Sequence, residues 1–173
     1  MTTANKITIF RVVLIPVFLV LAYTDQKYWA FAVFVLASLS DMLDGYIARH
    51  YNQITDFGKF MDPLADKVLV MAAMCFFVER GYMPGWVLAI VLLREFAVSG
   101  MRLVAVEQGG RVIAAAWSGK VKTAVTMVGL CAMLLFCQHS WVNTLVSLLI
   151  LLTTVYSGAE YFYKNRDVFR NVE

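Results

Sequence analysis

Residues 41–66 read DMLDGYIARHYNQITDFGKFMDPLAD, and they lie between two apolar stretches, Tyr28–Leu39 and Val68–Val78. The flanks consist mostly of residues that favour a membrane interior, whereas the quoted stretch carries several carboxylates. A charged side chain is costly at membrane depth. The pattern therefore predicts two membrane helices whose polar ends meet in a protected cavity and do not face lipid.

The composition of the whole chain supports a membrane fold. Of its 173 residues, 61% are hydrophobic and 16% are charged, whereas about a quarter of the residues in an ordinary soluble domain are charged. A water-soluble fold of this size could not bury so much apolar surface, and a disordered chain would be far more polar. We expect one domain over residues 1–173. The three cysteines lie in apolar stretches, and we expect no disulfide.

Six apolar stretches predict an all-α bundle of six transmembrane helices, because a backbone surrounded by lipid must satisfy its hydrogen bonds internally. Several stretches are shorter than the roughly 20 residues that a span requires, so their helices must continue into polar flanks. No cleavage site follows the first stretch, which we interpret as a retained helix. The stretches are Ile9–Tyr23, Tyr28–Leu39, Val68–Val78, Met83–Leu93, Thr123–Cys137 and Trp141–Tyr163.

The basic residues predict the orientation of this bundle. If the six helices alternate, twelve of the fifteen Lys and Arg residues fall on the side of both termini. Only Lys27 and Arg80 fall on the opposite side, and Arg94 lies within the fourth stretch. Cytoplasmic loops carry such an excess of Lys and Arg. We therefore expect a multi-pass protein of the inner membrane, with cytoplasmic termini and a polar active-site cavity at the cytoplasmic end.

The spacing of the polar residues gathers them on two helix faces. On a helix over residues 40–50, positions i, i+3, i+4, i+7 and i+8 share one face, and they hold Asp41, Asp44, Gly45, Ala48 and Arg49. The connection to the next helix is short, so the two helices are expected to be antiparallel neighbours.

The next helix repeats the arrangement, with Gly58, Asp62 and Asp66 at i, i+4 and i+8. Four carboxylates would then converge, and like charges at close range need cations to remain ionised. Four carboxylates, with no His or Cys among the residues named on these two faces, favour Mg²⁺ or Mn²⁺, and two such ions form a known phosphoryl-transfer device. Small residues on this face leave room for a nucleotide or pyrophosphate, and an arginine can hold a phosphate.

Each of these residues also has a purely structural interpretation. Asp62 precedes Pro63 and suits a helix start. Asp41 and Asp44 could pair with Arg49 or Lys67, and the small residues could form a helix contact. These interpretations do not explain all eight positions together.

The eight residues, at their spacing, resemble the signature of the CDP-alcohol phosphotransferase family. The resemblance implies transfer of a phosphatidyl group from CDP-diacylglycerol to an alcohol, with release of CMP. It implies that Asp41, Asp44 and Asp62 bind metal, that Asp66 is the general base and also touches a metal, and that Gly45, Ala48 and Arg49 line the CDP site. Asp41, Asp44 and Gly58 are expected at that site too. The family usually forms homodimers through its membrane helices, and no nucleic-acid partner is expected.

Two shorter segments are similar to family members that use glycerol 3-phosphate as the acceptor. They are Asn5-x2-Thr8-x2-Arg11, and Arg94-Glu95-Phe96 together with Arg102. The phosphate of such an acceptor needs a cationic pocket, for which we predict Arg102, Arg94, Arg111, Lys120, Arg11 and Thr8. The alternatives are membrane anchoring for Arg102, Arg111, Lys120 and Lys122, and a pair with Glu95 or another acid for Arg94.

Three functional hypotheses follow. The first is a metal-dependent phosphatidyltransferase that uses sn-glycerol 3-phosphate. The second keeps the reaction but uses inositol phosphate, serine or phosphatidylglycerol as the acceptor. The third is a cation transporter whose carboxylates line a pathway. The third is disfavoured because the acids gather at one end of the helices and no charges line the other half.

Overall fold

The structure is a computed structural model that describes residues 3–50, 56–107 and 116–166, with side chains described at 7–40, 64–106 and 116–166. The described residues form six α-helices and no strand, which confirms the predicted all-α class for this part of the chain. The helices are α1 (Thr3–Tyr23), α2 (Lys27–His50), α3 (Asp56–Glu79), α4 (Gly85–Glu107), α5 (Trp117–Phe136) and α6 (Ser140–Lys164).

The helices extend beyond the apolar stretches, as the short lengths of those stretches required. α2 continues for eleven residues past Leu39 and ends at His50, and α3 begins at Asp56, well before Val68. The polar stretch of residues 41–66 is therefore helical on both sides of residues 51–55. This confirms the predicted helical backbone for all eight positions of the family signature.

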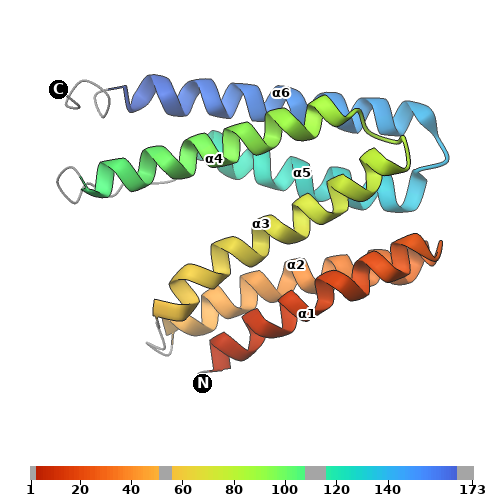
Figure 1. Cartoon of the computed structure of the whole chain (residues 1–173), viewed down its shortest axis with the longest axis horizontal. Helices are drawn as coiled ribbons and strands as arrows, with labels where there is room; N and C mark the ends of the chain where they lie inside the picture. The colour runs from red at the N-terminus through yellow and green to blue at the C-terminus, as the bar shows by residue number, and fades with distance from the viewer. Residues whose placement is uncertain (1–2, 51–55, 108–115, 167–173) are drawn as a thin grey trace.

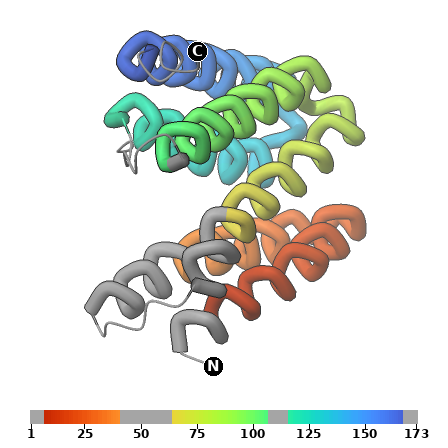
Figure 2. The backbone as a smooth tube through the Cα atoms, turned by 60° about the vertical axis from the view of Figure 1, so that its left-hand side comes forward, coloured from red at the N-terminus to blue at the C-terminus, as the bar shows by residue number. Residues whose placement is uncertain are grey.

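The helices alternate in direction along one long axis of the molecule. In Figure 1, α1, α3 and α5 begin at the left-hand end, and α2, α4 and α6 end there. α1 and α2 lie together on one side and α4, α5 and α6 on the other, with α3 crossing diagonally between them in both Figure 1 and Figure 2. α3 contacts α1, α2, α4 and α5, so it joins the two sides of the bundle.

The main apolar core is formed by buried side chains from all six helices. Phe18 of α1 packs on Phe34 of α2, with ring centroids 5.6 Å apart. α5 and α6 approach closely at Gly129, where a Cβ atom would lie only 2.7 Å from Val146 Cγ1. Small residues that allow close backbone approach are typical of helix contacts in membranes.

The surface of the bundle is apolar to an extent that suits lipid. α5 and α6 are long and apolar enough to span a membrane, and shorter apolar helices run over Ile7–Tyr23 and Lys27–Ser40. Large apolar side chains point outward on the other helices as well, including Leu93, Phe96 and Leu103 of α4. Soluble monomers rarely expose such extended apolar surfaces. Three charged residues of α4, Arg94, Glu95 and Arg102, instead line a cavity.

Candidate active site

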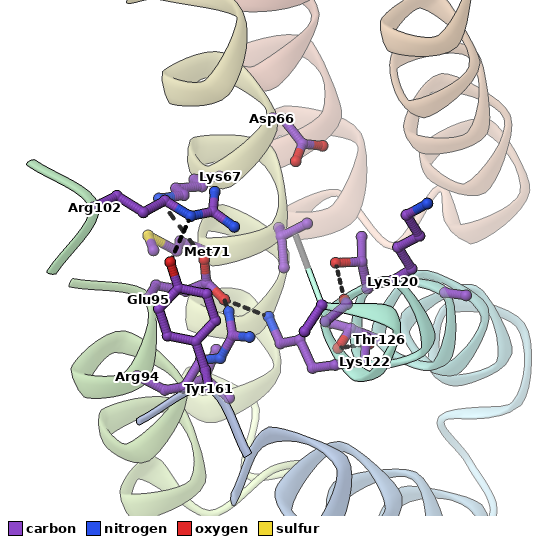
Figure 3. A pocket seen from close by; sticks show the side chains of 16 residues that line it. Asp66, Lys67, Met71, Arg94, Glu95, Arg102, Lys120, Lys122, Thr126 and Tyr161 are labelled. Atoms are coloured by element: carbon purple, nitrogen blue, oxygen red, sulfur yellow. Dashed lines mark hydrogen bonds and ion pairs between the residues drawn. The ribbon is translucent and has the colours of Figure 1, made fainter. Parts of the chain in front are cut away.

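A cavity of about 520 Å³ lies between α3, α4, α5 and α6. Its wall comes from four helices, and the charged or hydrogen-bonding side chains on it can be followed in Figure 3. They are Asp66 and Lys67 of α3, Arg94, Glu95 and Arg102 of α4, Lys120, Lys122, Thr123 and Thr126 of α5, and Tyr161 of α6.

Glu95 is the centre of the charged network in this cavity. Its Oε1 accepts hydrogen bonds from Lys122 Nζ at 2.8 Å and from Arg94 Nη1 at 3.0 Å, and its Oε2 lies 3.8 Å from Lys67 Nζ. The Glu95 side chain is 14% exposed and that of Lys122 is 7% exposed. Charges this deeply buried persist when they are paired. One carboxylate thus fixes cations from three helices.

Lys67 connects α3 and α4 through a second contact. Its Nζ donates a hydrogen bond of 2.6 Å to Ser99 Oγ, one turn beyond Glu95 on α4. Because Lys67 follows Asp66 directly in the chain, this contact ties the middle of α3, where Asp66 lies, to α4.

Arg94 lies in a slot made by two glycines on neighbouring helices. A Cβ atom at Gly119 of α5 would lie 3.4 Å from Arg94 Nη2, and one at Gly158 of α6 would lie 3.3 Å from Arg94 Cγ. A Cβ atom at Gly158 would crowd the arginine, and one at Gly119 would be in van der Waals contact with it. The absence of side chains there lets a long cation lie between α5 and α6 while its Nη1 reaches Glu95.

Arg102 lies two turns further along α4 and is held by α6. Its Nε donates a hydrogen bond of 3.0 Å to the Tyr161 hydroxyl, and its Cζ lies 5.5 Å from the centroid of the Tyr161 ring. In Figure 3 the guanidinium extends from the side wall toward the centre of the cavity. Arg102 is an exposed residue, whereas Tyr161 is only 2% exposed.

The lining is strongly cationic. It contains five side chains of Lys and Arg against the two carboxylates Asp66 and Glu95, which gives a formal charge of +3. Clefts lined by charge of one sign concentrate ligands of the opposite sign. Lys and Arg are the side chains that bind phosphate groups. The cavity is therefore suited to an anion such as a phosphate ester, with one carboxylate, Asp66, at its edge.

The structure brings four of the predicted site residues to this one cavity: Asp66, Arg94, Arg102 and Lys120. Two others lie elsewhere. Thr8 and Arg11 are fully buried on α1, and Arg11 Nε donates to Ser40 Oγ of α2 at 3.3 Å. Ser40 directly precedes Asp41 in the chain, so Arg11 lies at the start of the signature and outside the lining of the cavity.

The remaining predicted residues are not covered by the described side chains. Arg111 lies outside the described residues, as do the side chains of Asp41, Asp44, Gly45, Ala48, Arg49, Gly58 and Asp62. Within the described part of the chain, no three His, Cys, Asp or Glu residues form a metal-binding group. Asp66 is the one predicted ligand whose side chain is described, so the metal site stays a prediction. A carboxylate beside a cationic pocket has the chemistry expected of a ligand for a hard divalent ion.

The predicted catalytic and binding residues did not include the cavity-lining Lys67, Glu95, Lys122 and Tyr161. Lys122 was considered a membrane anchor, but it is buried and paired. Its position within an otherwise apolar helix was the signal, because a charge there tends to face the bundle interior. The alternative considered for Arg94, a pair with Glu95, is present, and Arg94 lines the cavity as well.

Comparison with known proteins identifies the family. The model of the CDP-alcohol phosphatidyltransferase family matches residues 1–156. A CDP-diacylglycerol–glycerol-3-phosphate 3-phosphatidyltransferase of Bacillus subtilis is 38% identical over 96% of both chains. The protein of the same name from Escherichia coli is 43% identical over 79% of this chain and 78% of its own.

A probable phosphatidylglycerophosphate synthase of Mycobacterium tuberculosis is 36% identical over 91% of this chain and 78% of its own. The family match covers most of the chain, including the cavity-lining parts of α3, α4 and α5. The chain therefore belongs to the CDP-alcohol phosphatidyltransferase family, a family of membrane enzymes.

Proposed function

We propose that the protein transfers the phosphatidyl group of CDP-diacylglycerol to sn-glycerol 3-phosphate and so forms phosphatidylglycerol phosphate and CMP. Relatives with this activity in their names align over most of the chain. The observation that carries the proposal is the presence of Asp66 in the same cavity as Arg94, Arg102 and Lys120. A base beside a cationic pocket is what an acceptor with its own phosphate requires.

The signature carboxylates would hold the metal ions. Asp41, Asp44 and Asp62, together with Asp66, provide four oxygen-ligand side chains on two adjacent helices. Two Mg²⁺ or Mn²⁺ ions bound there would neutralise the pyrophosphate charge of the CDP-lipid. Around the nucleotide, the proposed CDP site comprises Asp41, Asp44, Gly45, Ala48, Arg49 and Gly58, on the faces that their helical spacing defines.

Asp66 would accept the proton of the acceptor hydroxyl. The hydroxyl oxygen attacks the phosphorus of the phosphatidyl group in line, a new phosphorus–oxygen bond forms, and the bond to the CMP oxygen breaks. The proton passes to an Asp66 carboxylate oxygen, and CMP leaves with the electron pair of the broken bond. Asp66 lies one helical turn beyond Asp62 toward the apolar core, at the cavity edge where the acceptor would lie.

The cationic wall would bind the phosphate of the acceptor. Arg102 and Lys120 are exposed lining residues with groups free to meet a ligand, while Arg94 supports the pocket from its slot between α5 and α6. A formal charge of +3 in the lining suits a phosphate dianion better than a zwitterion such as serine. Arg111, Arg11 and Thr8 remain proposed members of the acceptor site, although the buried Thr8 and Arg11 lie outside the lining of this cavity.

We further propose that all six helices span the inner membrane and that the cavity faces the cytoplasm, because the predicted excess of Lys and Arg is at that end. The two termini would be cytoplasmic, and the protein would be a homodimer within the membrane. Digestion of a C-terminal tag tests the orientation. The tag should be cleaved in inside-out vesicles and protected in right-side-out vesicles, and the reverse pattern would contradict it.

The decisive test of the acceptor is a screen with purified protein, labelled CDP-diacylglycerol and each divalent ion. Glycerol 3-phosphate, inositol phosphate, serine and phosphatidylglycerol would be supplied separately, and labelled products separated by chromatography. We expect phosphatidylglycerol phosphate as the main product. A larger product yield with any other acceptor would refute the proposed acceptor, and no release of CMP with any of them would refute the transferase.

A further inference from the structure

We propose that Tyr161 is a positioning residue that acts through Arg102 and fixes its guanidinium for the phosphate of the acceptor. The inference rests on the proposed function. Tyr161 lies on α6, far along the chain from residues 41–66, and its α6 position is beyond residue 156, where the family match ends. In the structure it lines the same cavity as Asp66 (Figure 3).

Tyr161 makes two contacts with Arg102 that together define the orientation of the guanidinium. The hydroxyl accepts the hydrogen bond from Nε at 3.0 Å, and the ring face lies 5.5 Å from Cζ. With the hydrogen bond alone, the guanidinium could still rotate about that bond. With the ring contact alone, it could still move across the ring face. The two contacts from one rigid side chain remove both freedoms.

The tyrosine itself has little freedom to move. It is 2% exposed and packs in a small apolar cluster with Val98, Met101 and Ala105 of α4. This cluster joins α4 to α6, and its Tyr161 also lines the cavity. The phenol therefore has a fixed position. Arg102 has a long, exposed side chain, which would sample many rotamers without its contacts with Tyr161.

The choice of Nε as the donor decides which arginine atoms remain for a ligand. Arginine carries five N–H donors, and the terminal nitrogens can bind a phosphate with two parallel hydrogen bonds. Because Tyr161 uses Nε, both Nη groups remain available on the cavity side. A preorganised guanidinium loses less conformational freedom when the acceptor binds, so the effect should fall on acceptor affinity and not on the chemical step.

The test is the change Tyr161→Phe, which removes one oxygen and keeps the buried ring. We expect the KM for glycerol 3-phosphate to rise about 5- to 10-fold, since the lost hydrogen bond involves a charged donor. The kcat and the KM for CDP-diacylglycerol should change less than about 2-fold. The matched control is Tyr163→Phe, two residues along α6, where the exposed ring contacts Arg166. It should leave all three parameters at wild-type values.

A double-mutant cycle separates positioning from a general structural role. Arg102→Ala should raise the KM for glycerol 3-phosphate more than Tyr161→Phe does, and adding Tyr161→Phe to that variant should change it no further. An equal rise in both backgrounds would overturn the inference, as would an unchanged KM in the single variant or an equal loss in all kinetic parameters. If the wild-type protein and the Tyr163→Phe control transfer nothing to glycerol 3-phosphate, the proposed function fails instead.

Discussion

Replacing Glu95 by Gln tests whether one carboxylate holds the cationic wall together. The substitution keeps the size of the side chain and one oxygen that can accept a hydrogen bond, but it removes the charge shared by Lys122, Arg94 and Lys67. Lys122 then becomes a buried ammonium without a counter-charge. In the described part of the chain its side chain forms an ion pair only with Glu95, at 2.8 Å.

The expected loss follows from the burial of the pair. Glu95 is 14% exposed and Lys122 is 7% exposed, and removing one partner of a buried ion pair costs about 3–5 kcal/mol. The amide oxygen of the introduced Gln can still accept a hydrogen bond from Lys122. We therefore expect the unfolding free energy to fall by the lower value of this range, about 3 kcal/mol. For a chain of this length, 1 kcal/mol shifts the unfolding midpoint by about 2–4 °C. The Tm of the purified protein in detergent should thus fall by about 6–12 °C.

The assay is thermal unfolding followed by gel filtration, with Glu160→Gln as the matched control. Glu160 pairs with Lys164 at the exposed end of α6, and an exposed pair contributes at most about 1 kcal/mol. Changing Lys122 to Met in the Glu95→Gln protein should restore part of the lost Tm, because it removes the unpaired charge. Two results would show that Glu95 does not hold the cationic wall together. One is a Tm for Glu95→Gln no lower than that of the control, and the other is no recovery of Tm when Lys122→Met is added.

Two further changes test the site and the packing. Asp66→Asn should lower kcat for transfer to glycerol 3-phosphate by about 10²–10⁴-fold, because the amide cannot accept the hydroxyl proton. If this variant keeps more than about a tenth of the wild-type kcat and has a normal Tm, Asp66 is not the base. Gly129→Ala should lower the unfolding free energy by about 1–3 kcal/mol, since its Cβ would lie 2.7 Å from Val146 Cγ1. The matched control is Gly100→Ala, which has open space around its Cβ and should be neutral or stabilising. Equal Tm values for Gly129→Ala and Gly100→Ala would contradict the close approach of α5 and α6.

The helical architecture could be predicted from the sequence because apolar length and residue spacing are local properties. The interpretation of residues 41–66 as the polar ends of two helices agrees with α2, which continues to His50, and α3, which begins at Asp56. The same reasoning found Asp66, Arg94, Arg102 and Lys120, since a charge in an apolar helix tends to face the bundle interior.

The partners of these residues could not be predicted in the same way. Spacing defines a helix face, but it does not say which other helix that face meets. The pairing of Tyr161 with Arg102 and of Lys122 with Glu95 depends on how α4 crosses α5 and α6. The two glycines beside Arg94 belong to different helices, and only their meeting in space gives them a role.

We propose that the carboxylates of α2 and α3 and the cationic cavity form one site for phosphatidyl transfer, whose dependence on a divalent ion can be measured. Its most direct measurement is the incorporation of labelled glycerol 3-phosphate into lipid by the purified protein with CDP-diacylglycerol, across a titration of Mg²⁺ or Mn²⁺. Incorporation should rise with either ion and fall to background with a chelator, with one CMP released for each labelled lipid formed. Equal incorporation in the chelator, or release of CMP without labelled lipid, would contradict the claim.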